Sequence, residues 1–121
     1  MTDGELYERA VAVAGRAYAP YSSFDVGAAA LARDGRVIEG VNVENAAYPL
    51  GICAERTALA RAVAEGYRPG DIEAIGITAS PCGGCRQWLV EFRIERVTYR
   101  SESGEIVTTT PSSLLPDTFR F

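Results

Sequence analysis

The three cysteines of the chain constrain its fold more than any other feature. They stand in two short clusters, Cys53 in GICAER and the pair Cys82 and Cys85 in SPCGGC, and the sequence contains no histidine. An odd number of thiols fits a set of disulfides poorly. The thiols therefore serve a metal, a nucleophile or packing. If one metal ion takes all three sulfurs, the chain must bring the two clusters together in space.

Both clusters are expected at the starts of helices. Residues 53–66 are rich in helix-forming residues and end at Gly66, and Pro81 precedes a second helix over roughly 82–92. Cys82 and Cys85 are three residues apart, so their sulfurs share one face of that helix. Cys53 can meet them if the two helices lie side by side. Helix amino termini favour negative charge and lower the pKa of a thiol, which suits thiolate ligands.

The remaining segments predict a mixed sheet with helices packed on it. Apolar residues at helical spacing predict a helix over about 3–18. Asp34-Gly35 predicts a hairpin between strands 25–32 and 35–44, and Ser103-Gly104 predicts one between 93–101 and 104–110. A further strand is expected at 71–79, a loop at 45–52, and a helical turn with a tail at 112–121. The length of 121 residues fits one domain, residues 1–121.

Three thiolates on a tetrahedral zinc ion leave one position free for water, as catalytic zinc sites do. Glu55, two residues after Cys53, is then well placed to accept a proton from that water and return it to a substrate. Three thiolates also give the site a formal charge of −1, which Arg56 or Arg86 could offset by hydrogen-bonding a sulfur. The alternative is that Cys53 is a small buried residue and the other two cysteines are an incidental pair.

The two clusters match the pattern of zinc-dependent nucleobase deaminases, which have a Cys₃ variant of the metal set, a glutamate that is not a ligand, and a P-C-x-x-C segment. Along nearly its full length the chain resembles the small homotetrameric cytidine deaminases. The stretches that carry the resemblance are AYAPYSSFDVGAA (17–29), DGRVIEGVNVENAAYPLGICAER (34–56), SPCGGCRQWLVEF (80–92) and LLPDTF (114–119).

The resemblance implies a three-layer α/β/α sandwich with a mixed five-stranded sheet, assembled as a homotetramer. It also implies one Zn²⁺ per subunit on Cys53, Cys82 and Cys85, with Glu55 as the catalytic acid and base. It favours Arg56 over Arg86 as the arginine beside the sulfurs.

The resemblance further implies a set of substrate contacts. Asn42 and Glu44 bind the ribose 3′-hydroxyl, and two residues this far apart on a strand do share a face. Phe24 packs near the sugar and base, although without the resemblance it would be a core residue. Backbone groups near Ala54 and Ser80 hold the pyrimidine edge and the leaving ammonia. Aromatic residues complete the set: Phe119 (or its rival Phe121) stacks on the base in a neighbouring subunit, and Tyr48 lies at the subunit boundary.

Some residues depart from the family pattern. The approach to Ser80 is short, which could shape access to the site or a subunit contact. Pro49 stands where glycine is common and could stiffen the loop before Cys53. Gly84 and Trp88 also differ from the usual residues. Trp88 is expected in the core or at a subunit interface, away from the active site.

The predicted function is zinc-dependent hydrolytic deamination of cytidine and deoxycytidine to uridine and deoxyuridine plus ammonia, in pyrimidine salvage. A blasticidin-S-type aminonucleoside deaminase and a zinc-stabilised binding module are the alternatives. A binding module would need a fourth ligand, and the sequence offers none of the usual type. Editing of a nucleic acid polymer is disfavoured because the net charge is −4 and single strands require a Lys/Arg groove.

The sequence also indicates where the protein works. The amino-terminal residues are acidic and their apolar positions are interrupted, unlike a signal peptide. No run approaches the ~20 apolar residues of a membrane span. We therefore expect a cytoplasmic protein with no membrane partner, in a reducing compartment where disulfides are rare.

Overall fold

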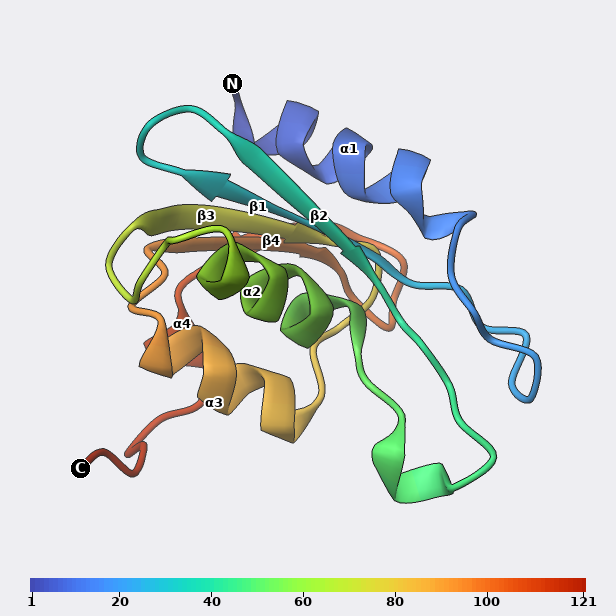
Figure 1. Cartoon of the computed structure of the whole chain (residues 1–121). Helices are drawn as coiled ribbons and strands as arrows, with labels where there is room; N and C mark the ends of the chain where they lie inside the picture. Colours follow the sequence, from blue (N-terminus) through green and yellow to red (C-terminus); the bar gives the residue numbers. More distant parts are fainter.

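A computed structural model describes all 121 residues as a five-stranded sheet with helices on both faces (Figure 1). The strands are ordered β2-β1-β3-β4-β5, with β3 and β4 parallel and the other neighbours antiparallel. The elements are α1 (Asp3–Ala14), β1 (Gly27–Ala32), β2 (Val37–Val41), η1 (Tyr48–Leu50), α2 (Ala54–Ala64), β3 (Ile72–Ile77), α3 (Gly83–Glu91), β4 (Arg96–Arg100), β5 (Ile106–Thr109) and α4 (Pro111–Leu114).

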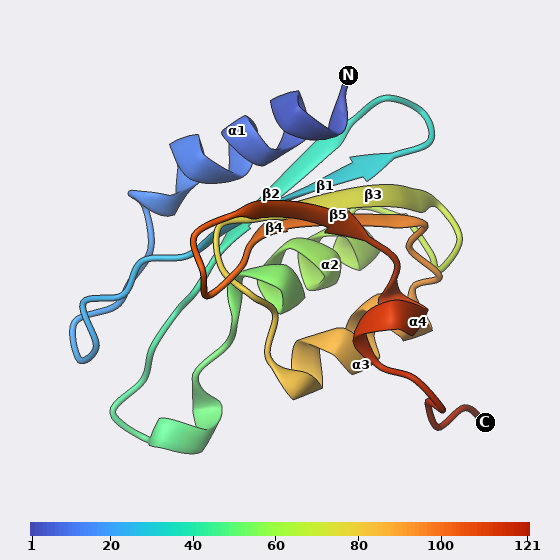
Figure 2. The ribbon, with the colours of Figure 1, turned by 180° about the vertical axis from the view of Figure 1, so that it is seen from behind.

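The sheet separates two apolar cores, which makes the molecule three layers thick. Helix α1 covers one face, and α2 and α3 cover the other (Figures 1 and 2). Strand β1 is buried along its whole length, with Ala29 and Leu31 in the smaller core under α1 and Ala28 and Ala30 in the larger one. The larger core also holds apolar residues of α2, α3 and the central strands, among them Leu59, Ile75, Ile77, Leu89 and Val97. The expected α/β/α sandwich is confirmed.

The predicted order of elements is confirmed, and several of the expected ends are wrong. Helix α1 stops at Ala14, and β1 starts at Gly27 instead of residue 25. In the segment before β1, the Asn42 side chain binds the Phe24 carbonyl and the Val26 N–H, and the Asn42 backbone N–H donates to the Val26 carbonyl. Within the expected loop 45–52, residues Tyr48–Leu50 form a short 3-10 turn.

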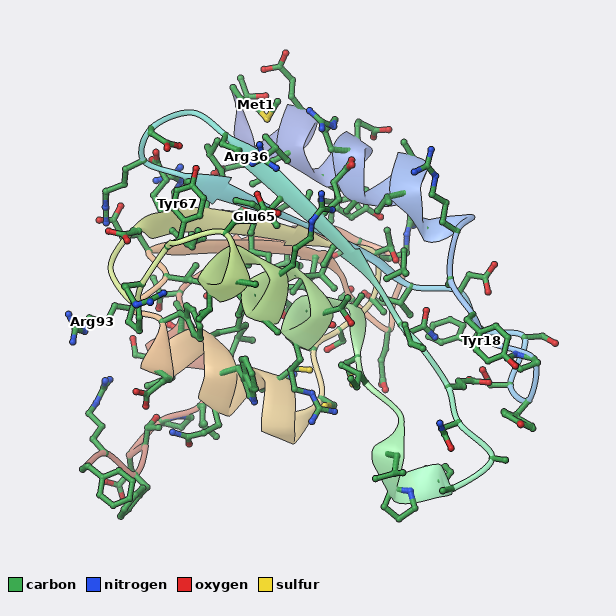
Figure 3. The ribbon with its side chains drawn as sticks, in the orientation of Figure 1. Met1, Tyr18, Arg36, Glu65, Tyr67 and Arg93 are labelled. Carbon is green, nitrogen blue, oxygen red and sulfur yellow. The ribbon has the colours of Figure 1, made fainter.

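The crossover from β3 through α3 to the parallel strand β4 places the start of α3 at the carboxyl end of β3. Helix α2 lies on the same face of the sheet, packed closely on β2. The closeness requires Gly40, where an added Cβ would lie 2.4 Å from the Ala58 nitrogen. At the far end of α2, Arg36 pairs with Glu65, and the Tyr67 hydroxyl donates to Asp34, which holds that end against the β1–β2 turn (Figure 3). No helix is both long and apolar enough to cross a membrane.

Candidate active site

The starts of α2 and α3 bring the three cysteine sulfurs together. Cys53 precedes α2, Cys82 precedes α3, and Cys85 lies in the first turn of α3. All three Sγ atoms lie within 4.8 Å of one another, and those of Cys53 and Cys82 are 3.8 Å apart. Zinc–sulfur bonds of ~2.3 Å in a tetrahedron separate two sulfurs by ~3.8 Å. The donor set and its spacing therefore fit a zinc ion bound by three thiolates.

The charges at this cluster favour cation binding. A hydrogen bond from Cys85, followed by one from Arg56, lowers the pKa of Cys53 to about 5. The same contact with Cys53, together with burial, raises the pKa of Cys85. The lowered pKa of Cys53 favours its thiolate form, which is the form that binds a metal ion, and a thiol that still holds its proton must release it on metal binding.

Two arginines near the cluster have different partners. Arg56 Nη2 donates to Cys53 Sγ at 3.3 Å, and this hydrogen bond raises the pKa of its guanidinium. Arg86 contacts no sulfur. It donates to the Pro81 carbonyl (2.8 Å), the Ser80 hydroxyl (3.2 Å) and the Leu114 carbonyl (3.0 Å). Arg86 thus ties the segment before Cys82 to the end of α4.

Glu55 lies in the first turn of α2 and is only 3% exposed. Burial raises the pKa of its carboxyl group, and the charge of Cys53 raises it further. A carboxyl group that holds its proton closer to neutral pH is suited to both accepting and donating a proton. Ala54, the first residue of α2, is fully buried, and Ser80 is half-buried in the segment that leads to Cys82.

An open cleft of about 740 Å³ borders the cluster at Cys53 and Arg56. Three predicted substrate or boundary residues line it: Asn42, Glu44 and Tyr48. Pro49, one of the departures from the family pattern, lies in the same wall. Phe24 is 61% exposed, so the interpretation of Phe24 as a core residue is wrong.

The structure does not bring the terminal aromatic residues to this cleft. Phe119 is 67% exposed, and its ring meets that of Phe121 edge to face at 5.2 Å. The tail runs past α3 on the side of the molecule away from the 19–24 and 44–52 loops (Figures 1 and 2). Trp88 is half-buried, stacks on Phe92 at 5.9 Å and packs against the larger core.

Sequence reasoning missed Ser22, which also lines the cleft and whose hydroxyl donates to Glu44. The two residues are 22 positions apart. No periodicity or local spacing relates them, so only the three-dimensional structure reveals the pair.

Comparisons with known proteins agree with this geometry. Residues 1–101 match the family model described as the cytidine and deoxycytidylate deaminase zinc-binding region. A cytidine deaminase from Halalkalibacterium halodurans is 45% identical over 122 aligned positions, covering 94% of this chain and 91% of the relative. One from Sporosarcina psychrophila is 45% identical and covers 86% and 81% of the two chains.

Solved structures show the same likeness. The crystal structure of cytidine deaminase from Burkholderia pseudomallei superposes with a TM-score of 0.91 at 46% identity, covering 98% of this chain and all of that one. The enzyme from Mycobacterium tuberculosis gives a TM-score of 0.85 at 35% identity, covering 100% and 99%. The similarity therefore extends over the whole fold, including the elements that carry the cysteines.

Proposed function

The chain belongs to the cytidine and deoxycytidylate deaminase family and is a zinc-dependent cytidine deaminase, and we propose which of its residues perform the reaction. Cys53, Cys82 and Cys85 would hold the zinc ion, which would act as a Lewis acid on a water molecule that attacks C4 of the base. The observation that carries the assignment of the acid and base is the burial of Glu55 beside the three sulfurs.

In this proposal Glu55 moves two protons. Its carboxylate first accepts a proton from the water whose oxygen adds to C4, and delivers it to N3 of the pyrimidine. It then carries the remaining proton of the added oxygen to the exocyclic amino group. The C4–N bond breaks, ammonia leaves, and the C4 carbonyl of uridine remains. Backbone groups near Ala54 and Ser80 hold the pyrimidine edge and the departing ammonia.

The ribose side of the site is proposed at the cleft. Asn42 and Glu44 bind the 3′-hydroxyl and Phe24 packs near the sugar and base. Asn42 and Glu44 line the same cleft as Cys53, which supports their proposed contact with the ribose. Because the 3′-hydroxyl is common to both nucleosides, we propose deoxycytidine as a second substrate. An ammonia-release assay with cytidine and blasticidin S distinguishes a cytidine deaminase from a blasticidin-S-type aminonucleoside deaminase. The proposed enzyme should release ammonia from cytidine.

We also propose that the enzyme is a cytoplasmic homotetramer built from one catalytic domain, residues 1–121, and that it acts in pyrimidine salvage. One sheet that takes strands from residues 27 to 109 supports a single domain. Three reduced thiols fit a reducing compartment. The separation of Phe119 from its own cleft supports a role in a neighbouring subunit, with Tyr48 at the boundary.

Glu55→Gln tests the central assignment. The variant keeps the size and hydrogen-bonding shape of the side chain but cannot accept a proton, so kcat should fall by at least ~10²-fold. Zinc content, measured by atomic absorption on the same sample, should stay at one ion per chain. Glu8→Gln, an equivalent change on the exposed face of α1, should leave both quantities unchanged. Parental turnover by Glu55→Gln would show that another group moves the protons.

A further inference from the structure

Asn42 and Glu44 both hold the loop that precedes β1. The Val26 N–H donates to Asn42 Oδ1 at 2.8 Å, and Asn42 Nδ2 donates to the Phe24 carbonyl at 2.8 Å. Glu44 Oε1 accepts the backbone N–H groups of Tyr21 and Ser22 at 2.9 and 3.1 Å. The other carboxylate oxygen, Oε2, accepts the Ser22 hydroxyl. The two predicted ribose ligands are therefore fixed by a loop that is distant in sequence.

The hydrogen-bonding capacity left on these two side chains matches one hydroxyl group. A carboxylate oxygen accepts about two hydrogen bonds, so Oε1 of Glu44 is filled and Oε2 has one acceptor position left. The Asn42 amide has two N–H groups and uses one, so one donor remains. A sugar hydroxyl needs one acceptor for its proton and one donor for its oxygen. Asn42 and Glu44 together offer that pair.

Ser22 decides how Glu44 presents its free acceptor position. Its hydroxyl is the only side-chain donor to that carboxylate, and its oxygen also accepts the Phe24 N–H at 3.0 Å. The hydrogen bond from Ser22 is the first cause of the lowered pKa of Glu44, so Ser22 favours the charged form of this acceptor. Without Ser22, Oε2 of Glu44 and the amide of Phe24 would each lose a partner.

We propose that Ser22 is a positioning residue for sugar recognition: it orients Glu44 toward the ribose 3′-hydroxyl and fixes the backbone that carries Phe24. The inference rests on the proposed assignment of Asn42 and Glu44 to that hydroxyl. Ser22 itself need not touch the substrate. Its effect should therefore depend on whether the substrate carries a 3′-hydroxyl.

Deoxycytidine and 2′,3′-dideoxycytidine differ only in that hydroxyl and provide the test. The parental enzyme should have the higher kcat/KM on deoxycytidine. Ser22→Ala should lower kcat/KM on deoxycytidine by about tenfold, mainly through KM, as loss of a hydrogen bond to a charged group implies. On dideoxycytidine the loss should stay below about twofold, because no 3′-hydroxyl is left to misplace. Ser22→Thr keeps the hydroxyl and should recover most of the deoxycytidine activity.

Ser103→Ala is the matched control, because it removes an exposed hydroxyl of the β4–β5 turn that is not among the residues lining the cleft. It should leave kcat/KM unchanged on both substrates. If Ser22→Ala lost the same factor in kcat/KM on both nucleosides, while the parental enzyme still preferred deoxycytidine, the role of Ser22 would be overturned. The assignment of Asn42 and Glu44 would then still stand. No parental preference for deoxycytidine would refute the assignment of Asn42 and Glu44, and the inference with it. Zinc content and melting temperature of each variant confirm that the folded site is being compared.

Discussion

At the scale of single residues, Arg56 is the cation that balances the thiolates, and its removal should be costly. Its Nη2 donates to Cys53, and its Nε is buried with no partner within the chain. In Arg56→Gln the three thiolates and zinc would keep an uncompensated charge of −1, which opposes activation of a water molecule. We expect kcat/KM for cytidine to fall by about ten- to a hundredfold, the usual range for partners of metal ligands.

Arg61→Gln provides the control for Arg56→Gln, because Arg61 lies on the same helix but is exposed and pairs with Glu65. Exposed ion pairs contribute ~0–1 kcal/mol, so this variant should keep its zinc and its activity. Zinc content and kcat/KM are measured for both proteins. Unchanged values for Arg56→Gln would mean that the charge of the thiolates is balanced elsewhere.

The residues of the zinc cluster could be predicted from the sequence because their constraints are local. The spacing of Cys82 and Cys85 puts two sulfurs on one face of a helix. The sulfur of Cys53 meets them because α2 and α3 lie in contact, which the spacing alone does not require. The choice between Arg56 and Arg86 could not be made from the residues alone, since each follows directly after a functional residue. Arg86 instead donates to Pro81, Ser80 and the carbonyl of Leu114, and the last of these lies 28 positions away, where no local pattern reveals it.

At the scale of elements, the close approach of α2 to β2 fixes the metal site, and Gly40 permits it. In Gly40→Ala the new Cβ would lie 2.4 Å from the Ala58 nitrogen and 2.6 Å from the Ala54 oxygen. The helix must move, and Cys53 and Glu55 flank Ala54. We expect the free energy of unfolding in urea to fall by about 1–3 kcal/mol or more, together with a loss of zinc affinity.

Gly15→Ala is the control for this substitution, because Gly15 has a helical backbone conformation and no atom within 4 Å of the added Cβ. It should be neutral or stabilising by about 0.4–1 kcal/mol, since it restricts the unfolded chain. If Gly40→Ala unfolded at the same urea concentration as the parental protein, the α2–β2 interface would be far more tolerant than its geometry implies.

The order of elements followed from apolar periodicity and turn residues, whereas their ends depended on side chains far away in sequence. Gly35 and Gly104 have φ angles of +95° and +90°, as the two predicted hairpin turns require. Just before β1, the Asn42 side chain takes the place of a strand partner for the Phe24 carbonyl and the Val26 N–H. A side chain that replaces the sheet as a hydrogen-bond partner leaves no periodic signal, so strand ends near a binding site are the hardest to predict.

At the scale of the whole molecule, several large apolar side chains are exposed on the surface of the chain. Tyr48 is 90% exposed on η1, and Phe119 and Phe121 are exposed on the tail. Exposed apolar groups of this size mark contact surfaces. The tail lies on the other side of the molecule from the 19–24 and 44–52 loops (Figure 1), and none of its residues lines the cleft. A base-stacking role for Phe119 therefore requires a second subunit, and under the proposed function that subunit would complete the active site.

Mixed assemblies test this directly. Phe119→Ala should lower kcat/KM by roughly tenfold, given ~1–3 kcal/mol for stacking of an aromatic ring on a base. Glu55→Gln should be almost inactive. In a co-expressed mixture, a Phe119→Ala subunit can receive Phe119 from a Glu55→Gln neighbour, so activity per Phe119→Ala subunit should rise above that of Phe119→Ala alone. If Phe119 acted in its own subunit, neither kind of site would be complete and mixing would bring no gain. A loss and rescue seen with Phe121→Ala instead would assign the stacking ring to Phe121.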